Sequence, residues 1–150
     1  MSELTVGVDV GGTKIAAGVV DEDGKLIAST RRDTPATDTH LVLEGIADAV
    51  RELRSHHEIS AVGIGAAGFV DVGRAKVLFA PNLAWRDEDL QAGLSAQLGV
   101  PVVVENDANA AAWAESRFGA GRDHDDLVVV TIGTGIGGGV VNRGRLMRGG

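Results

Sequence analysis

The sequence predicts a mixed α/β domain, in which antiparallel strands at the start continue into strands separated by helices. Three apolar runs come first, at residues 4–10, 15–20 and 26–34. Helical and strand-like patterns alternate after them, beginning with a helical pattern at 39–55. Strands joined by short turns pair antiparallel, and strands joined through a helix can pair parallel. We therefore expect one sheet that contains both kinds of pairing.

Turn residues separate the first three predicted strands. Gly11 and Gly12 follow the first strand, and Asp23-Gly24 lies before the third. Asp-Gly between two apolar runs is a strong hairpin signal. These turns favour a three-stranded antiparallel start.

The following segments alternate between helix and strand. The segment 39–55 is predicted to be helical, with Asp38 or Thr39 as its cap, because apolar residues recur at spacings of three and four. Those residues are Leu43, Ile46, Ala47, Val50 and Leu53. The later predicted elements are a strand at 59–65, a loose stretch with 76–79 extended, a helix at 87–98, a strand at 100–104 and a helix at 106–118.

A second sheet begins near the end of the chain. A glycine-containing hinge at 119–124 precedes apolar runs at 127–132 and 139–142. Two strands cannot close a hydrophobic core by themselves. We therefore predict a small N-terminal lobe at 1–118 and the truncated start of a C-terminal lobe at 119–150.

Composition and charge exclude several classes of function. The formal net charge is −7, which argues against nucleic acid as a partner because phosphate-backbone binding needs a basic face. There is no cysteine, so disulfides and thiolate metal sites are excluded, and the four histidines show no metal-site spacing. With no signal peptide or membrane-length apolar run, we expect a cytoplasmic protein without a membrane partner.

The glycine cluster after the first strand suggests a phosphate-binding loop. Gly11 and Gly12 let the backbone approach a phosphate closely. Asp9 is placed to orient a Mg²⁺ ion or its water shell, while Thr13 and Lys14 add a hydroxyl and a positive charge. The alternative is a tight hairpin with incidental glycines, since short glycine motifs have many false positives.

A second glycine cluster follows the strand at 127–132. Five of the seven residues at 133–139 are glycine, which is more than a turn requires and indicates that a ligand contacts the main chain. The predicted nucleotide-binding residues in this cluster are Gly133, Thr134, Gly135, Gly137, Gly138 and Gly139.

Polar residues lie between the two glycine clusters, where a strand gives way to a helix. Asp107 is the candidate general base, because a carboxylate at this junction can take a proton from a hydroxyl. Capping of the helix explains Asn106 or Asp107 taken singly. It explains less well the combination with Glu105 and Asn109.

Asn82 and two glycines are candidates for binding a polyol. Asn82 follows a proline and could both donate and accept hydrogen bonds, although an asparagine in this position is often only a turn residue. Gly65 and Gly68 could bring main chain against the same ligand.

Four motifs in this order resemble the ROK family of repressors, open reading frames and kinases, and within it the bacterial glucokinase branch. The motifs are DVGGTK at 9–14, APNLAW at 80–85, ENDANA at 105–110 and GTGIGGG at 133–139. The resemblance covers nearly the whole chain. It implies the ribonuclease H-like fold of actin, Hsp70 chaperones and hexokinases, and ATP-dependent phosphorylation of glucose at its 6-hydroxyl.

The resemblance also implies roles for particular residues. Asp107 would accept the proton of the sugar 6-hydroxyl, and Asn82 and Asn106 would bind sugar hydroxyls. Gly65 and Gly68 would line the sugar pocket, with Glu105 beside it. The two glycine loops would grip the phosphates of ATP, with Mg²⁺, from opposite lobes.

Family members are about twice as long as this chain, so the resemblance implies that it is an N-terminal half. The other half would carry a Glu-x-Gly-His sugar contact, a His/Cys₃ zinc site whose ligands are absent here, the adenosine pocket and a final helix. A dimer or tetramer is also implied. A kinase for N-acetylmannosamine or fructose, a non-catalytic sugar sensor and a chaperone-type ATPase are the alternatives, and fold alone does not decide among them.

Overall fold

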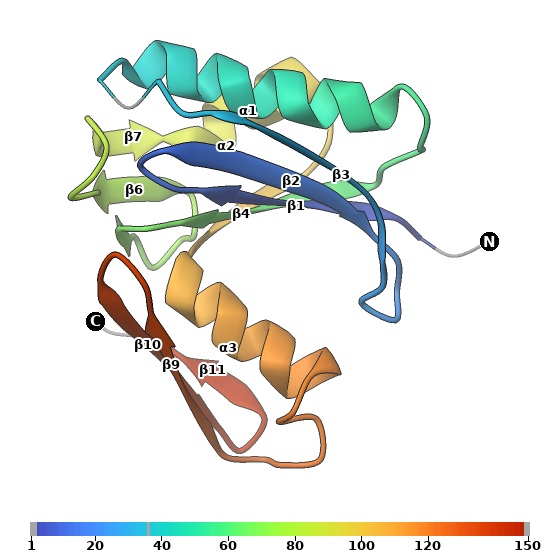
Figure 1. Ribbon diagram of the computed structural model, residues 1–150, viewed down its shortest axis with the longest axis vertical. Coiled ribbons are helices and arrows are strands. Elements are labelled where there is room, and N and C mark those ends of the chain that lie inside the picture. Colours follow the sequence, from blue (N-terminus) through green and yellow to red (C-terminus); the bar gives the residue numbers. More distant parts are fainter. Residues whose placement is uncertain (1–2, 36, 149–150) are drawn as a thin grey trace. The chain divides into compact units, whose positions relative to one another are not determined.

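The computed structural model describes residues 3–35 and 37–148, so positions 1, 2, 36, 149 and 150 of the predicted lobes lie outside it. The chain forms two compact units, Met1–Glu105 and Asn106–Gly150 (Figure 1). Within the described residues, no helix has the length and apolar character needed to cross a bilayer.

The elements follow the predicted order closely. The first unit contains β1 (Thr5–Val10), β2 (Lys14–Val20), β3 (Leu26–Asp33), α1 (Thr39–Arg54), β4 (Ala61–Ala66), β5 (Phe69–Val70), β6 (Lys76–Phe79), β7 (Arg86–Asp89), α2 (Leu90–Leu98) and most of β8 (Val102–Asn106). The second contains α3 (Asp107–Phe118), β9 (Leu127–Ile132), β10 (Ile136–Asn142) and β11 (Arg145–Met147).

A five-stranded sheet in the order β3-β2-β1-β4-β8 forms the centre of the first unit. β2 pairs antiparallel with both β1 and β3. β1 pairs parallel with β4, and the connection that parallel pairing needs runs through α1. The predicted mixed sheet is therefore confirmed.

The two faces of this sheet differ in character. Val6, Val8 and Val10 of β1 are buried in the core that also contains apolar residues of α1 and α2. Gly7 and Asp9, between them in sequence, are exposed on the other face. Side chains alternate between the faces of a strand, so the valine spacing assigns one face to the helices.

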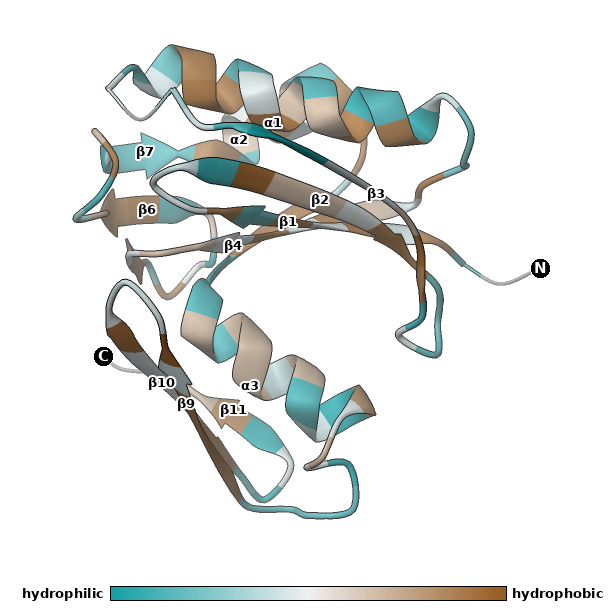
Figure 2. Ribbon diagram, in the orientation of Figure 1, coloured by the Kyte–Doolittle hydropathy of each residue, from teal (hydrophilic) through white to brown (hydrophobic). Residues whose placement is uncertain are grey.

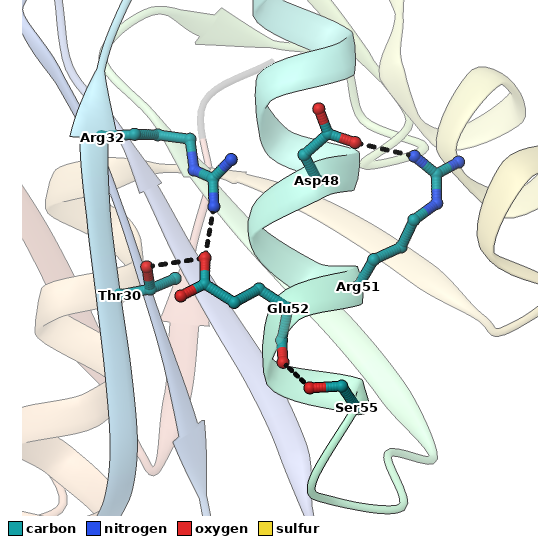
Figure 3. Close-up of polar contacts among 6 residues, drawn as sticks. All are labelled: Thr30, Arg32, Asp48, Arg51, Glu52 and Ser55. Atoms are coloured by element: carbon teal, nitrogen blue, oxygen red, sulfur yellow. Dashed lines mark hydrogen bonds and ion pairs between the residues drawn. The ribbon is translucent and has the colours of Figure 1, made fainter.

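Side chains also connect α1 to the sheet (Figure 3). Asp38 caps α1 by accepting hydrogen bonds from two backbone N–H groups, which settles the predicted choice of cap. Near the other end of α1, Glu52 Oε2 accepts hydrogen bonds from Thr30 Oγ1 at 3.0 Å and Arg32 Nη2 at 2.5 Å, both on β3. These contacts join α1 to β3, but their exposure limits their contribution to stability to at most about 1 kcal/mol.

A three-stranded sheet, β5-β6-β7, follows β4. The segment 87–98 was predicted to be wholly helical, but α2 begins only at Leu90. The preceding residues are extended because they pair with β6, as in the pair Val77–Glu88. Asp89 then caps α2 by accepting a hydrogen bond from Ala92 N at 3.0 Å.

The turn between β5 and β6 is organised by one carboxylate. Asp71 accepts hydrogen bonds from Ala75 N at 2.8 Å and Lys76 N at 2.9 Å. These two backbone donors hold the pKa of the Asp71 carboxyl below its usual value. Within the same turn, Arg74 O accepts a hydrogen bond from Val104 N at 2.9 Å, which attaches the hairpin to β8.

In the second unit, α3 packs on β9 and β10. The division between the units therefore falls after Glu105, whereas the sequence placed it after Phe118. Two strands were expected in this sheet, and the structure has three, in the order β11-β10-β9. Arg143 and Gly144 both have positive φ angles, as a two-residue type I′ hairpin turn requires. This turn connects β10 to β11.

The face of this sheet opposite α3 is apolar and exposed. Figure 2 shows β9 as a largely hydrophobic strand. Along β9 the side chains alternate between partly buried and exposed, as expected for a strand that packs on one face. The exposed apolar side chains of the sheet are Val128, Val130, Ile132, Ile136, Val140 and Met147.

Gly139→Ala should destabilise the second unit by about 1–3 kcal/mol, because a β-carbon there overpacks the contact with α3. It would lie 2.4 Å from Ala112 Cβ and 2.8 Å from Ala108 O. Gly138→Ala is the matched control, since its β-carbon would meet only Val129 O, at 3.7 Å. Urea unfolding of both variants checks this, and equal free energies of unfolding would contradict it.

Candidate functional site

The loop predicted to bind phosphate is held in shape from both ends. Gly11 N donates to Lys14 O at 2.9 Å across the turn. Thr34 Oγ1 donates to Gly11 O, and Thr34 N donates to Thr13 O, both at 2.9 Å. Thr34 follows β3 and is 23 residues from Gly11, so no local sequence pattern pointed to it.

Asp9 lies on the face of the sheet opposite α1 and α2, as the burial pattern of β1 shows. Its partner in the parallel pairing of β1 and β4 is Gly65. Glu105 lies on the same face of the sheet, because Val102 and Val104 of β8 belong to the buried core on the other face. Three predicted site residues thus share one face.

The carboxylate chemistry of this face is compatible with magnesium. Among residues 3–35 and 37–148, no three His, Cys, Asp or Glu side chains gather as a metal site. Mg²⁺ is commonly bound through only one or two carboxylates, with water and substrate phosphates as the remaining ligands. Asp9 could therefore serve as the single carboxylate ligand of a Mg²⁺ ion that is also bound by the phosphates of a substrate.

Lys14 has a partner that the sequence did not reveal. Lys14 begins β2 and lies directly across from Asp33 of β3. Its Nζ forms a hydrogen-bonded ion pair with Asp33 Oδ1. The hydrogen bond and the positive charge of Lys14 both hold the pKa of the Asp33 carboxyl below its usual value. Asp33 therefore compensates the cation that was predicted to meet phosphate.

Two close contacts in the first unit involve predicted site residues. A β-carbon on Gly68 would lie 2.4 Å from Phe79 O, so this backbone contact requires glycine and closes the base of the β5–β6 hairpin. A β-carbon on Gly12 would lie 3.0 Å from Asn82 Cβ. The predicted sugar-binding residue Asn82 is thus brought beside the predicted phosphate loop, whereas Gly68 packs against the end of β6.

The segment around Asn82 is anchored by its apolar neighbours. Ala80, Leu83 and Trp85 are buried in the core, whereas Asn82 is exposed. The alternation places the amide at the surface of a firmly held segment. The sequence identified Asn82, but the anchoring role of Trp85 became visible only in the fold.

The capping and catalytic interpretations of the segment 105–109 apply to different residues. Asn106 is the N-cap of α3, where its Oδ1 accepts a hydrogen bond from Asn109 N at 3.1 Å. Asp107 begins the helix, is exposed, and accepts a hydrogen bond from Ala108 N at 2.9 Å. Capping thus explains Asn106, and it leaves an exposed carboxylate at the start of α3 available for chemistry.

Four of the five glycines in the second cluster divide into two groups. Gly133 and Gly135 form the turn between β9 and β10 with Thr134, and a β-carbon on either would meet nothing within 4 Å. Gly137 and Gly139 lie on β10 against Ala108 of α3. Close helix packing therefore explains these two glycines, and the case for ligand contact rests on the turn.

Residues 5–150 match the model of the ROK family. The chain belongs to the ROK family. It is 54% identical to a glucokinase of Streptomyces coelicolor over 146 residues, which are 97% of this chain and 46% of that protein. The chain thus spans about half the length of such relatives.

Solved structures of sugar kinases share its fold. The glucokinase of Streptomyces griseus, crystallised with glucose and AMPPNP, aligns with a TM-score of 0.93 and 55% identity over 97% of this chain and 46% of that one. An inorganic polyphosphate/ATP-glucomannokinase of Arthrobacter sp. strain KM aligns with a TM-score of 0.88 and 38% identity over 99% of this chain and 62% of that one. The predicted fold class, that of the actin and hexokinase type, is confirmed.

Proposed function

We propose that the full-length protein is a glucokinase, which transfers the γ-phosphoryl group of ATP to the 6-hydroxyl of glucose. One observation carries this proposal: 97% of the chain aligns at 55% identity with a glucokinase crystallised with glucose and AMPPNP. AMPPNP stands in for ATP, because the nitrogen that bridges its β- and γ-phosphorus atoms makes this linkage resistant to hydrolysis.

Each candidate sugar-site residue has a role in this proposal. Asp107 accepts the proton of the 6-hydroxyl as the oxygen attacks the γ-phosphorus. Asn82 and Asn106 hydrogen-bond sugar hydroxyls. Gly68 and Gly65 line the pocket, with Glu105 at its side. The exposure of Asp107 and the firm anchoring of the segment around Asn82 support these assignments.

The two glycine loops are proposed to bind the nucleotide. The backbone N–H groups of Gly11, Gly12 and Thr13 are proposed to meet phosphate oxygens, with Lys14 adding charge beside Asp33. Residues 133–139 are proposed to meet the phosphates from the C-terminal lobe, chiefly through the turn at 133–135. Bound Mg²⁺, oriented by Asp9, would neutralise charge that develops on the phosphates. We also propose that the protein acts in the cytoplasm as a homodimer or homotetramer.

A panel of donors and acceptors tests the proposed function in the natural protein at its full length. Release of ADP is measured with glucose, fructose or N-acetylmannosamine, and phosphorylation of glucose is measured with ATP or polyphosphate. Glucose with ATP should give the highest kcat/KM. Glucose binding without turnover from any donor would instead identify a non-catalytic sugar sensor.

A relative gives the reason for comparing ATP with polyphosphate as the phosphoryl donor. The related Arthrobacter protein is named for both polyphosphate and ATP. ATP-dependent turnover that polyphosphate does not replace would support the nucleotide assignment. Turnover with polyphosphate alone would contradict it.

A further inference from the structure

Gly12 is a glycine for a reason other than its backbone angle. Within the part of the chain that the structure describes, the glycines with positive φ are Gly24, Gly99 and Gly144. Gly12 is not among them, so its conformation is open to ordinary residues. What disfavours a side chain is lack of space, because a β-carbon at Gly12 would lie 3.0 Å from Asn82 Cβ, which Asn82 can accommodate only by shifting, and 3.4 Å from Asn82 O.

The neighbouring glycine provides a contrast within the same turn. A β-carbon on Gly11 would meet only Lys14 O, at 3.4 Å, which is ordinary van der Waals contact. The tight contact with the segment around Asn82 is therefore particular to Gly12 and is not a general property of the turn.

We propose that Gly12 is a positioning residue for Asn82: its bare α-carbon lets the segment that carries Asn82 rest directly on the phosphate loop. This inference depends on the proposed function, in which Asn82 binds the sugar. The phosphate loop then determines the geometry of sugar binding even when no nucleotide is present.

Neither side of the contact can yield easily. The phosphate loop is held by two hydrogen bonds from Thr34. On the opposite side, Leu83 and Trp85 are buried, and Gly68 already lies against Phe79 O. A methyl group at position 12 must therefore displace Asn82 itself. Small displacements of a substrate-positioning group cause large losses in binding and rate.

The test compares Gly12→Ala, Asn82→Ala and their combination in the natural full-length protein. Equilibrium binding of glucose is measured by calorimetry without nucleotide, and the KM values for glucose and ATP are measured separately. Asn82→Ala should weaken glucose binding about tenfold, as expected for the loss of one or two hydrogen bonds. Gly12→Ala should weaken it to a similar degree, and the double variant should be no worse than Asn82→Ala alone, because both remove the same interaction.

Gly7→Ala is the matched control, since it adds the same methyl group on β1, where a β-carbon would meet nothing within 4 Å. It should leave nucleotide-free glucose binding unchanged. Normal glucose binding by Gly12→Ala, beside weakened binding by Asn82→Ala, would overturn the inference and reduce Gly12 to a phosphate contact. Normal binding by Asn82→Ala would instead remove the sugar role of Asn82 from the proposed function.

A stability measurement tests the contact independently of any ligand. Gly12→Ala should lower the Tm in the natural background and lower it less in an Asn82→Gly background, where the opposing β-carbon is gone. An equal Tm decrease in both backgrounds would show that Gly12 does not press on Asn82. This comparison remains informative if Gly12→Ala folds poorly at assay temperature.

Discussion

Asp107→Asn in the full-length protein should lower kcat on the order of 10²–10⁴-fold and leave glucose affinity nearly unchanged. The amide keeps the size of the carboxylate and can still accept a hydrogen bond from Ala108 N, as Asp107 does at 2.9 Å. It has no basic oxygen with which to remove the proton of the 6-hydroxyl. The measurements are glucose-dependent release of ADP and calorimetric binding of glucose.

Asp89→Asn is the control for a charge change at the start of a helix. Asp89 caps α2 through Ala92 N, and asparagine caps helices about as well as aspartate does. We expect its kcat to match that of the natural protein. A near-normal rate for Asp107→Asn would refute the assignment of Asp107 as general base.

Trp85→Ala should reduce the free energy of unfolding by about 3–5 kcal/mol, the usual cost of truncating a fully buried aromatic residue. Trp85 is 0% exposed and follows the segment that carries Asn82. Its removal leaves a cavity beneath that segment, so glucose binding should weaken as well. Denaturant unfolding followed by circular dichroism measures the first effect, and calorimetry measures the second.

The other tryptophan offers the matched comparison. Trp113 on α3 is 40% exposed, and the Arg117 guanidinium lies 5.6 Å from its ring centroid. An exposed cation–π pair contributes about 0.5–1 kcal/mol, so Trp113→Ala should be much milder. Similar losses from the two substitutions would show that Trp85 does not anchor the segment around Asn82.

Local patterns in the sequence predicted most of the fold. The apolar run at 4–10 predicted the strand that the structure shows as β1, and the recurring apolar residues of α1 predicted an amphipathic helix. Such patterns repeat every two or every three to four residues, so a short window of sequence contains the whole signal. The motifs around Asp9, Asn82 and Asp107 likewise indicated the family, because each is a contiguous run.

The errors in the predicted elements have one physical cause. Residues 87–89 are extended because β6 lies beside them, and nothing in their own spacing encodes that partner. The first unit ends at Glu105, earlier than the lobe expected at 1–118, because α3 packs on a sheet that comes later in the chain. Tertiary contacts overrode local preference in both places.

The sequence established the order of most strands and helices, the family motifs and the residue types available for phosphate, sugar and proton transfer. Only the tertiary structure showed why particular positions carry those residues. Gly12 leaves room for Asn82, Gly139 leaves room for Ala112, and Asp33 pairs with Lys14. Each of these contacts joins residues that are distant in the chain. Local periodicity carries no information about which distant residues will lie beside each other in the fold.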